Sequence, residues 1–307
     1  MARRLRPDAR VFASISLVAG LALVTFDRLP LAAQTSPAAS LGTGELLGRV
    51  STYVQAYYAR AQSLMVEETV TVQPVRADLS PDGFARRLLY DLRFEWTPDS
   101  ATEKPRVDVV RQLLLANNRP ARPGAEPKCL DPMPVTPEPL EFLLPTHHGD
   151  FDFTHAGPTQ FDGRAAVLLD YKPRSSGTPS AKVDPKGTND RECVLLDVPR
   201  RFRGRIWIDP NTDAVLRIDE TLVGPTEVPV PRKAELAFSR FITLMRSDST
   251  MRYTAVRFSD PDETLMLPTT IENVWVTASN GIRGVRMTQH YRNYRRFLTE
   301  SRIVPVP

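Results

Sequence analysis

The stretch GRIWIDPNTDAVLRID, Gly204–Asp219, decides the fold class of this chain. A Trp and two Ile precede Asp209-Pro210-Asn211, and an apolar alternation resumes after it. Asp209 offers a side-chain acceptor at the first turn position, Pro210 presets φ at the second, and Asn211 tolerates the backbone conformation of the third. The pattern therefore predicts a strand, a tight turn and a second, antiparallel strand.

The same period of two recurs through most of the chain. In 84–96 the even positions are apolar except for Arg86, whereas charged residues occupy several odd positions; the apolar ones are Phe84, Leu88, Tyr90, Leu92, Phe94 and Trp96. Asn280-Gly281 is a strong signal for a second hairpin turn. Similar strand patterns occupy 66–75, 106–116, 163–171, 202–208, 214–223, 234–245, 251–258, 269–277 and 282–297. We therefore expect a mainly β fold, an antiparallel meander of about ten strands with one apolar, buried face.

One amphipathic helix is expected before the strands. Its apolar residues recur at steps of three and four, with Thr43 as the N-cap: Leu46, Leu47, Val50, Tyr53, Val54, Tyr57, Tyr58 and Ala61. Such a stripe is suited to packing on the dry face of a sheet.

Two long connections interrupt the meander. Residues 119–145 contain eight prolines, and 172–200 are polar with several Gly, Ser and Pro. Loops of this length are uncommon in a compact domain and are often functional. We expect Cys129 in the first and Cys193 in the second to form a disulfide that staples both into a flap over one end of the sheet, with two independent thiols as the alternative.

The N-terminus has the three parts of a secretory signal. Four Arg precede an apolar run from Val11 to Phe26, and small residues lead to Ala33. We expect cleavage after Ala33, a linker over 34–42, a single β domain over 43–307, and a periplasmic location; an uncleaved anchor is the alternative. Residues 1–33 hold five Arg and two Asp, so without them the net charge falls from +4 to +1. This balance does not favour nucleic acid as a partner.

Few residues indicate chemistry. HHGDFDFTH gathers His147, His148 and His155 with two Asp, but its spacing matches no zinc motif, so we expect a solvated loop and no metal or other cofactor. Nucleophile elbows, P-loops and dinucleotide fingerprints are missing from the sequence. The pairs Glu67-Glu68 and Asp219-Glu220 are interpreted as solvated strand edges rather than acid–base pairs, because neighbouring side chains of a strand point to opposite faces.

The segment YRNYRRF, 291–297, interleaves aromatic and basic residues. We interpret it as a strand whose Arg side chains cover apolar surface and maintain solubility. Transient contact with an anionic membrane surface is the alternative.

Three motifs together resemble a known superfamily. FDGRAAVLLDYKP (161–173), the opening hairpin and LPTTIENVWV (267–276) resemble the LolA/LolB-like periplasmic lipoprotein carriers and their relatives, including RseB-type sensors. The resemblance implies a strongly curved, half-open β-barrel with an N-terminal helix and long covering loops. It also implies an apolar concave face that accepts acyl chains.

On this basis we expect a non-enzymatic protein that binds a lipid, a lipoprotein acyl chain or another apolar ligand. The expected ligand contacts are Leu88, Tyr90, Leu92, Phe94, Trp96, Trp207 and Trp275, and the expected plug is Leu140, Phe142, Leu143 and Leu144. An ordinary filled core is the alternative for the row on 88–96. The alternative functions are an envelope sensor that recognises a protein partner and a metal-dependent hydrolase at the three histidines.

Overall fold

The computed structural model describes residues 42–61, 63–97, 106–122, 131–132, 139–184, 193–231, 240–279 and 281–296. The signal segment 1–33, linker residues 34–41 and Cys129 lie outside these ranges. All the described residues belong to one compact unit.

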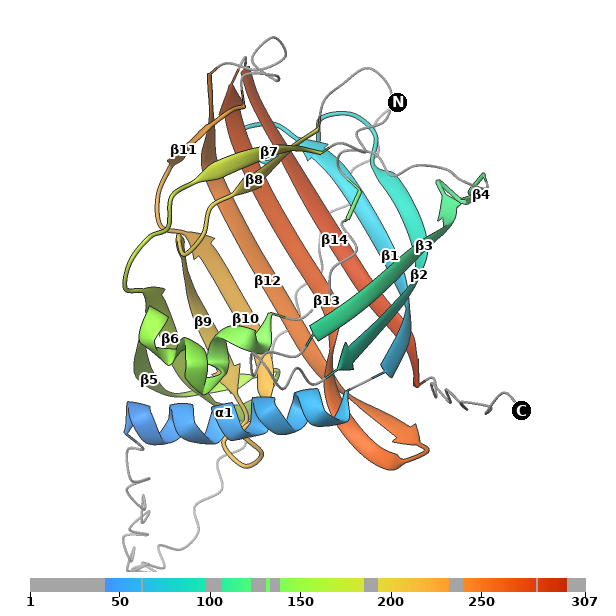
Figure 1. The fold of residues 1–307 in the computed structure, drawn as a ribbon. Coiled ribbons are helices and arrows are strands. Elements are labelled where there is room, and N and C mark those ends of the chain that lie inside the picture. Colours follow the sequence, from blue (N-terminus) through green and yellow to red (C-terminus); the bar gives the residue numbers. More distant parts are fainter. Residues whose placement is uncertain are drawn as a thin grey trace, which may run out of the picture. The chain divides into compact units, whose positions relative to one another are not determined.

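A 12-stranded antiparallel sheet dominates this unit (Figure 1). Its order is β4-β3-β2-β1-β14-β13-β12-β10-β9-β6-β5, with β11 paired to β12. The path ends at β4 and β5 without closing, which is consistent with a curved, half-open sheet. The strands are β1 (Ser63–Val75), β2 (Arg86–Thr97), β3 (Arg106–Ala116), β4 (Arg119–Pro120), β5 (Phe151–Phe161), β6 (Arg164–Pro173), β9 (Phe202–Ile208), β10 (Val215–Leu222), β11 (Thr226–Pro229), β12 (Phe241–Ser259), β13 (Asp262–Ser279) and β14 (Gly281–Arg296).

The mainly β, antiparallel prediction is confirmed, with differences in the number and length of strands. The patterns at 234–245 and 251–258 belong in their described parts to one long strand, β12. β5 forms where we expected a solvated loop, because Phe151 and Phe153 pack against the core. Phe84 does not belong to the row of β2, since that strand begins at Arg86 and Phe84 is fully exposed.

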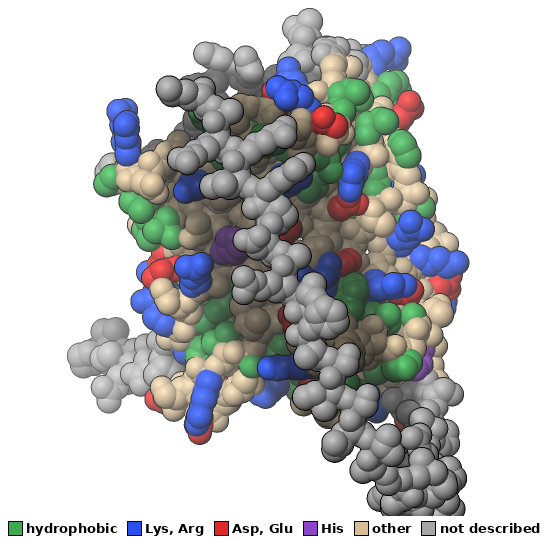
Figure 2. Space-filling model, turned by 180° about the vertical axis from the view of Figure 1, so that it is seen from behind, with side chains coloured by type: hydrophobic (Ala, Val, Ile, Leu, Met, Phe, Trp, Pro, Cys, Tyr) green, Lys and Arg blue, Asp and Glu red, His purple; other side chains and the backbone are tan. Residues whose placement is uncertain are grey.

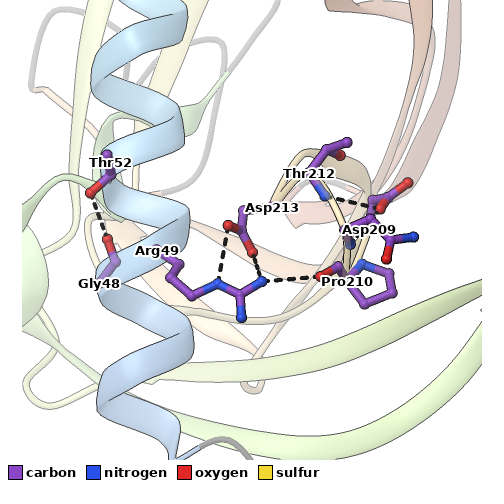
Figure 3. Close-up of polar contacts among 8 residues, drawn as sticks. Gly48, Arg49, Thr52, Asp209, Pro210, Thr212 and Asp213 are labelled. Atoms are coloured by element: carbon purple, nitrogen blue, oxygen red, sulfur yellow. Dashed lines mark hydrogen bonds and ion pairs between the residues drawn. The ribbon is translucent and has the colours of Figure 1, made fainter.

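The opening stretch forms the predicted hairpin of β9 and β10. Asp209 Oδ1 accepts hydrogen bonds from the backbone N–H groups of Asn211 at 2.8 Å and Thr212 at 3.2 Å. Figure 3 shows that the turn also binds the helix α1 (Thr43–Arg60): Arg49 Nη2 donates to Asp213 Oδ1 at 2.5 Å and to the Pro210 carbonyl at 3.0 Å. The turn thus joins α1 to the part of the sheet that contains β9 and β10.

The helix has the predicted apolar stripe but not the predicted cap. Gly42 is the N-cap and makes no side-chain capping bond. The Thr43 hydroxyl accepts a hydrogen bond from the His155 backbone N–H at 3.1 Å instead, so it ties the start of α1 to β5. α1 lies across one end of the sheet (Figure 1). No helix in the described ranges is long and apolar enough to cross a membrane.

The second insertion is not a plain loop. β7 (Ser180–Asp184) and β8 (Cys193–Asp197) pair as a separate two-stranded sheet. Val194 and Leu196 pack against Val230 and Ile242 near β12, and this apolar contact explains why a polar segment forms strands. β8 begins at Cys193, but its expected partner Cys129 is not described, so the disulfide stays a prediction.

Candidate functional site

The candidate site lies on the inner face of the sheet, the face toward which α1 packs. Alternation along β2 places the predicted row on this face: Leu88, Tyr90, Leu92, Phe94 and Trp96, each at most 4% exposed. The row divides between two apolar clusters. Leu92, Phe94 and Trp96 belong to the larger one, and Leu88 and Tyr90 belong to the smaller one.

We call the larger group the helix-covered cluster, because α1 contributes Leu46, Val50, Val54 and Tyr57 to it. The Trp96 ring lies 4.8 Å from that of Phe94 and 6.2 Å from that of Tyr57, in edge-to-face geometry. Aromatic pairs in this arrangement stabilise beyond their buried area. The helix therefore packs against Leu92, Phe94 and Trp96, the C-terminal part of the predicted row.

The predicted plug residues join the same cluster. Leu140, Leu143 and Leu144 are at most 6% exposed, and Phe142 packs beside them. They lie on and beside the 3-10 helix η1 (Leu140–Leu143), which is followed by a second one, η2 (Pro145–Asp150). Ser51 of α1 donates a hydrogen bond to the Leu143 carbonyl at 2.7 Å. η1 is thus joined to the helix by both apolar and polar contacts.

The smaller group is here named the sheet cluster: Val70, Val72, Leu88, Tyr90, Val285 and Met287. Trp275 and Leu113 pack against it and are partly buried. All of these residues belong to β1, β2, β3, β13 and β14, so within the described ranges no helix contributes to the cluster.

Polar side chains separate the two clusters in the middle of the inner face. Glu68 of β1 is fully buried and pairs with Arg111 of β3, whose side chain is 4% exposed. Arg111 Nε lies 2.7 Å from Glu68 Oε2, and Nη2 lies 3.1 Å from Oε1. Gln289 Nε2 and the Tyr291 hydroxyl also donate to Glu68 Oε1, at 2.7 and 3.0 Å. Burial, with the Glu68 carboxylate nearby, raises the pKa of Tyr291 well above its ordinary value.

The polar row continues toward β6. Gln289 accepts a weak hydrogen bond from Asn273 at 3.5 Å, and the strand register places Asn273 opposite Ser249 and Ser249 opposite Glu220. The Tyr171 hydroxyl donates to Glu220 Oε1 at 2.5 Å. The set Arg111, Glu68, Tyr291, Gln289, Asn273, Ser249, Glu220 and Tyr171 is called the polar seam below.

Burial raises the pKa of Glu220 above its ordinary value, although the Tyr171 hydrogen bond opposes that effect. Gly204 is required beneath this pair, because a side chain there would overlap the Tyr171 ring. The glycine thus lets the Tyr171 ring lie flat against β9.

The interpretation of the two acidic pairs as solvated strand edges was wrong for one residue of each pair. Glu68 is buried, and Glu220 is largely shielded from water, whereas Glu67 and Asp219 make contacts near the surface. The signal was present in the sequence: Glu68 occupies an inward position in the alternation of Leu64, Val66 and Val70. A charged residue in register with a buried apolar row indicates a buried partner.

The two remaining tryptophans lie on opposite faces. Trp275 packs against the sheet cluster on the inner face. Trp207 alternates with the buried Ile206 and Ile208, so it faces outward, with the Arg217 guanidinium 4.8 Å from its ring centre. There it lines a groove of about 710 Å³ together with charged residues such as Asp170 and Arg205. Trp207 is therefore not beside the other predicted contacts.

The first insertion returns to the inner face at Asp131. Asp131 Oδ1 lies 2.6 Å from Arg86 Nη1, and its side chain is 1% exposed. Arg86 is directly opposite Val72 of the sheet cluster in the β1–β2 register. Burial and the nearby Asp131 carboxylate raise the pKa of the Tyr90 hydroxyl. The insertion thus contacts the inner face at Asp131 and at η1.

The three histidines do not form a common site. His147 Nε2 lies 3.3 Å from Glu141, and His148 Nε2 lies 2.8 Å from the Ser51 hydroxyl at the helix. His155 belongs to β5. Among the residues that the structure describes, no group of three His, Cys, Asp or Glu side chains is placed to hold a metal.

Charged side chains of both signs are visible on one face of the molecule (Figure 2). On the face drawn in Figure 2, basic and acidic side chains are interspersed rather than gathered by sign. β14, which carries most of the YRNYRRF segment, lies inside the sheet between β1 and β13. Its Tyr291 points inward, and Arg296 pairs with Glu263.

No protein-family model matches this chain, and a search of curated proteins found no match. Among solved structures, it is similar to a DUF1329 family protein from Desulfovibrio piger, at 9% identity over 85% of this chain and 95% of that one, with a TM-score of 0.36. It is also similar to a LolA superfamily protein from Nitrosomonas europaea (11% identity, 84% and 94% coverage, TM-score 0.28) and to a chain of the Pseudomonas aeruginosa MucA/MucB complex (8%, 81% and 99%, 0.23). The superfamily that the sequence motifs resemble is thus among the structures found.

Proposed function

We propose that this chain is a non-enzymatic periplasmic protein that binds an apolar ligand, a lipid or acyl chain, over the sheet cluster. One observation carries the proposal: within the described residues, strands alone build this apolar face, whereas α1 and η1 cover the other end. An apolar surface bordered by a few convergent polar groups is the usual form of a small-molecule site.

Two described parts of the first insertion, Asp131 and η1, act as the cover in this proposal. The Asp131–Arg86 ion pair holds the first part near Val72, and Leu140, Leu143 and Leu144 hold the second against α1. A ligand that binds only when the cover has moved shifts the protein toward the open state. Opening of the ion pair and binding of an acyl chain are then coupled.

The ligand contacts in this proposal are Leu88, Tyr90 and Trp275. Leu92, Phe94 and Trp96 support them from the helix-covered cluster, since α1 packs against that part of the row. Trp207 takes no part, because it faces outward.

An interaction module is the second candidate function. β5 is the last strand at one edge of the sheet and is 11 residues long, and a partner peptide can extend a sheet at such an edge. However, a register shift between His155 and Gly157 interrupts the β5–β6 ladder, and irregularities of this kind also protect an edge from unwanted pairing. This function predicts a pulled-down partner and no bound lipid.

Quenching of single tryptophans by a brominated acyl ester, dibrominated methyl stearate, tests the lipid-binding proposal. The variant W96F/W207F keeps only Trp275, and the matched control W96F/W275F keeps only Trp207 on the outer face. We expect saturable quenching of Trp275 and none of Trp207. Equal quenching of both, or of neither, would overturn the proposal, and native mass spectrometry with lipid extraction would identify a retained ligand.

A further inference from the structure

The Arg111 guanidinium has an unused donor in a buried position. Its Nε and Nη2 atoms bind both oxygens of Glu68, at 2.7 and 3.1 Å, in a two-pronged arrangement. Its Nη1 atom is buried and has no hydrogen-bond partner among the described residues. A buried N–H group without a partner is unfavourable, so an acceptor at this point would be bound with a gain in free energy.

The position of Arg111 suits the polar end of an apolar ligand. The β2–β3 register places Arg111 opposite Leu92 of the helix-covered cluster, while Leu113, its neighbour on the same face, is opposite Tyr90 of the sheet cluster. The Arg111 guanidinium lies 5.7 Å from the centre of the Tyr90 ring. A chain that lies on the sheet cluster therefore ends beside Arg111.

Glu68 cancels the charge of this arginine. Its Oε1 atom lies within hydrogen-bond distance of Arg111, Gln289 and Tyr291, which hold the carboxylate in place. The second basic residue near the sheet cluster, Arg86, is paired in the same way with Asp131. Each of these two cations thus has its own carboxylate.

A neutralised buried pair discriminates between ligand head groups. A second anion beside Glu68 would lose its hydration and meet a like charge at low dielectric, with no uncompensated cation to offset either cost. An ester or amide carbonyl accepts the Nη1 hydrogen bond without that cost.

We propose that the Glu68–Arg111 pair makes this site selective for acyl ligands whose polar end is an uncharged carbonyl, as in esters and amides, over acyl ligands with an anionic head group. The inference rests on the proposed lipid-binding function. Glu68 acts as the specificity determinant, and Arg111 Nη1 donates to the ligand.

The test compares two probes that differ only at the head group: dibrominated stearic acid and its methyl ester, at pH 8, with the variant that keeps Trp275. We expect the ester to bind roughly ten-fold more tightly, because only the acid has to bring a desolvated negative charge beside Glu68. Glu68→Gln removes the anion and leaves Arg111 charged, so the preference is expected to reverse toward the acid. Glu67→Gln, on the outer face of the same strand, is the matched control and is expected to keep the preference of the unchanged protein.

The outcomes separate this inference from the proposed function. Quenching of Trp275 by both probes with equal or better binding of the acid leaves lipid binding intact and overturns the selectivity. No quenching by either probe overturns both. If Glu68→Gln does not fold, the double variant E68Q/R111M removes both charges and the Nη1 donor, so it is expected to bind the ester several-fold more weakly than the unchanged protein. An unchanged affinity for the ester in that variant would overturn the role of the pair.

Discussion

The two ends of the inner face are both apolar and both nearly inaccessible to water, yet they are built differently. In the helix-covered cluster, α1 and η1 contribute side chains that interdigitate with the sheet, as Tyr57 does with Trp96. In the sheet cluster, the described contributors are strands, and Asp131 of the first insertion is held near the cluster by one ion pair with Arg86. Burial alone therefore does not distinguish the two clusters. They differ in whether a described helix packs into the cluster, and our proposal assigns the ligand to the cluster without one.

The largest effect is expected at the helix-covered end. Phe94→Ala removes a ring that is 2% exposed and packs against Trp96, so it should cost about 3–5 kcal/mol of stability. Urea unfolding followed by circular dichroism measures this loss. A cost below about 1 kcal/mol would mean that the site can collapse or is not well packed, contrary to a core role.

Met287→Ala, in the sheet cluster, should destabilise the protein less than Phe94→Ala does and should weaken ligand binding more. The side chain is 7% exposed and belongs to a cluster without a helix, so we expect a loss of about 2 kcal/mol, at the low end for such substitutions. Saturable quenching of Trp275 by the brominated ester should weaken at the same time. Unchanged quenching would move the ligand away from the sheet cluster.

Asp131→Asn tests whether the ion pair between Asp131 and Arg86 keeps the proposed cover closed. The substitution weakens the pairing with Arg86, raises the population of the open state, and should raise the apparent affinity for the brominated ester several-fold. Asp91→Asn, which affects an ion pair with Arg93 within β2, is the control and should leave the affinity unchanged. Reduced affinity in the Asp131 variant would show that the insertion holds the ligand rather than excluding it.

The smallest effect concerns pH and the other end of the polar seam. Because burial raises the pKa of Glu220, the folded protein retains a proton that the unfolded chain releases, and stability is lost as the pH rises from the ordinary Glu value through the folded pKa. Glu220→Gln cannot ionise and can still accept the Tyr171 hydrogen bond. Its thermal midpoint should therefore match that of the unchanged protein at pH 4 and exceed it at pH 8. A constant difference across this range would contradict the assigned cause.

Local pattern predicted much of the fold for a physical reason. In a strand with one buried face, apolar and polar side chains must alternate. The apolar row from Leu88 to Trp96 and the hairpin turn at Asp209 could therefore be predicted without knowledge of tertiary contacts. β5, β7 and β8 were missed because their segments contain Gly, Pro or many polar residues. Contacts with distant apolar residues stabilise them: β8 packs against Ile242, and Phe151 and Phe153 of β5 pack against the helix-covered cluster. The prediction of Thr43 as the N-cap was wrong for a related reason: its hydroxyl binds the backbone of β5, 112 residues away in the sequence.

The sequence by itself determined the antiparallel architecture, the helix stripe and the inward direction of the aromatic row, because these follow from the periodicity of side chains along a helix or strand. Only the tertiary structure decided how that row divides between a helix-covered cluster and a sheet cluster, and which charges meet inside. Glu68 and Arg111 lie 43 residues apart, and Gln289 lies 221 residues from Glu68. The polar seam exists only because the order of the strands places β14, β1, β2 and β3 side by side, and no local pattern specifies that order.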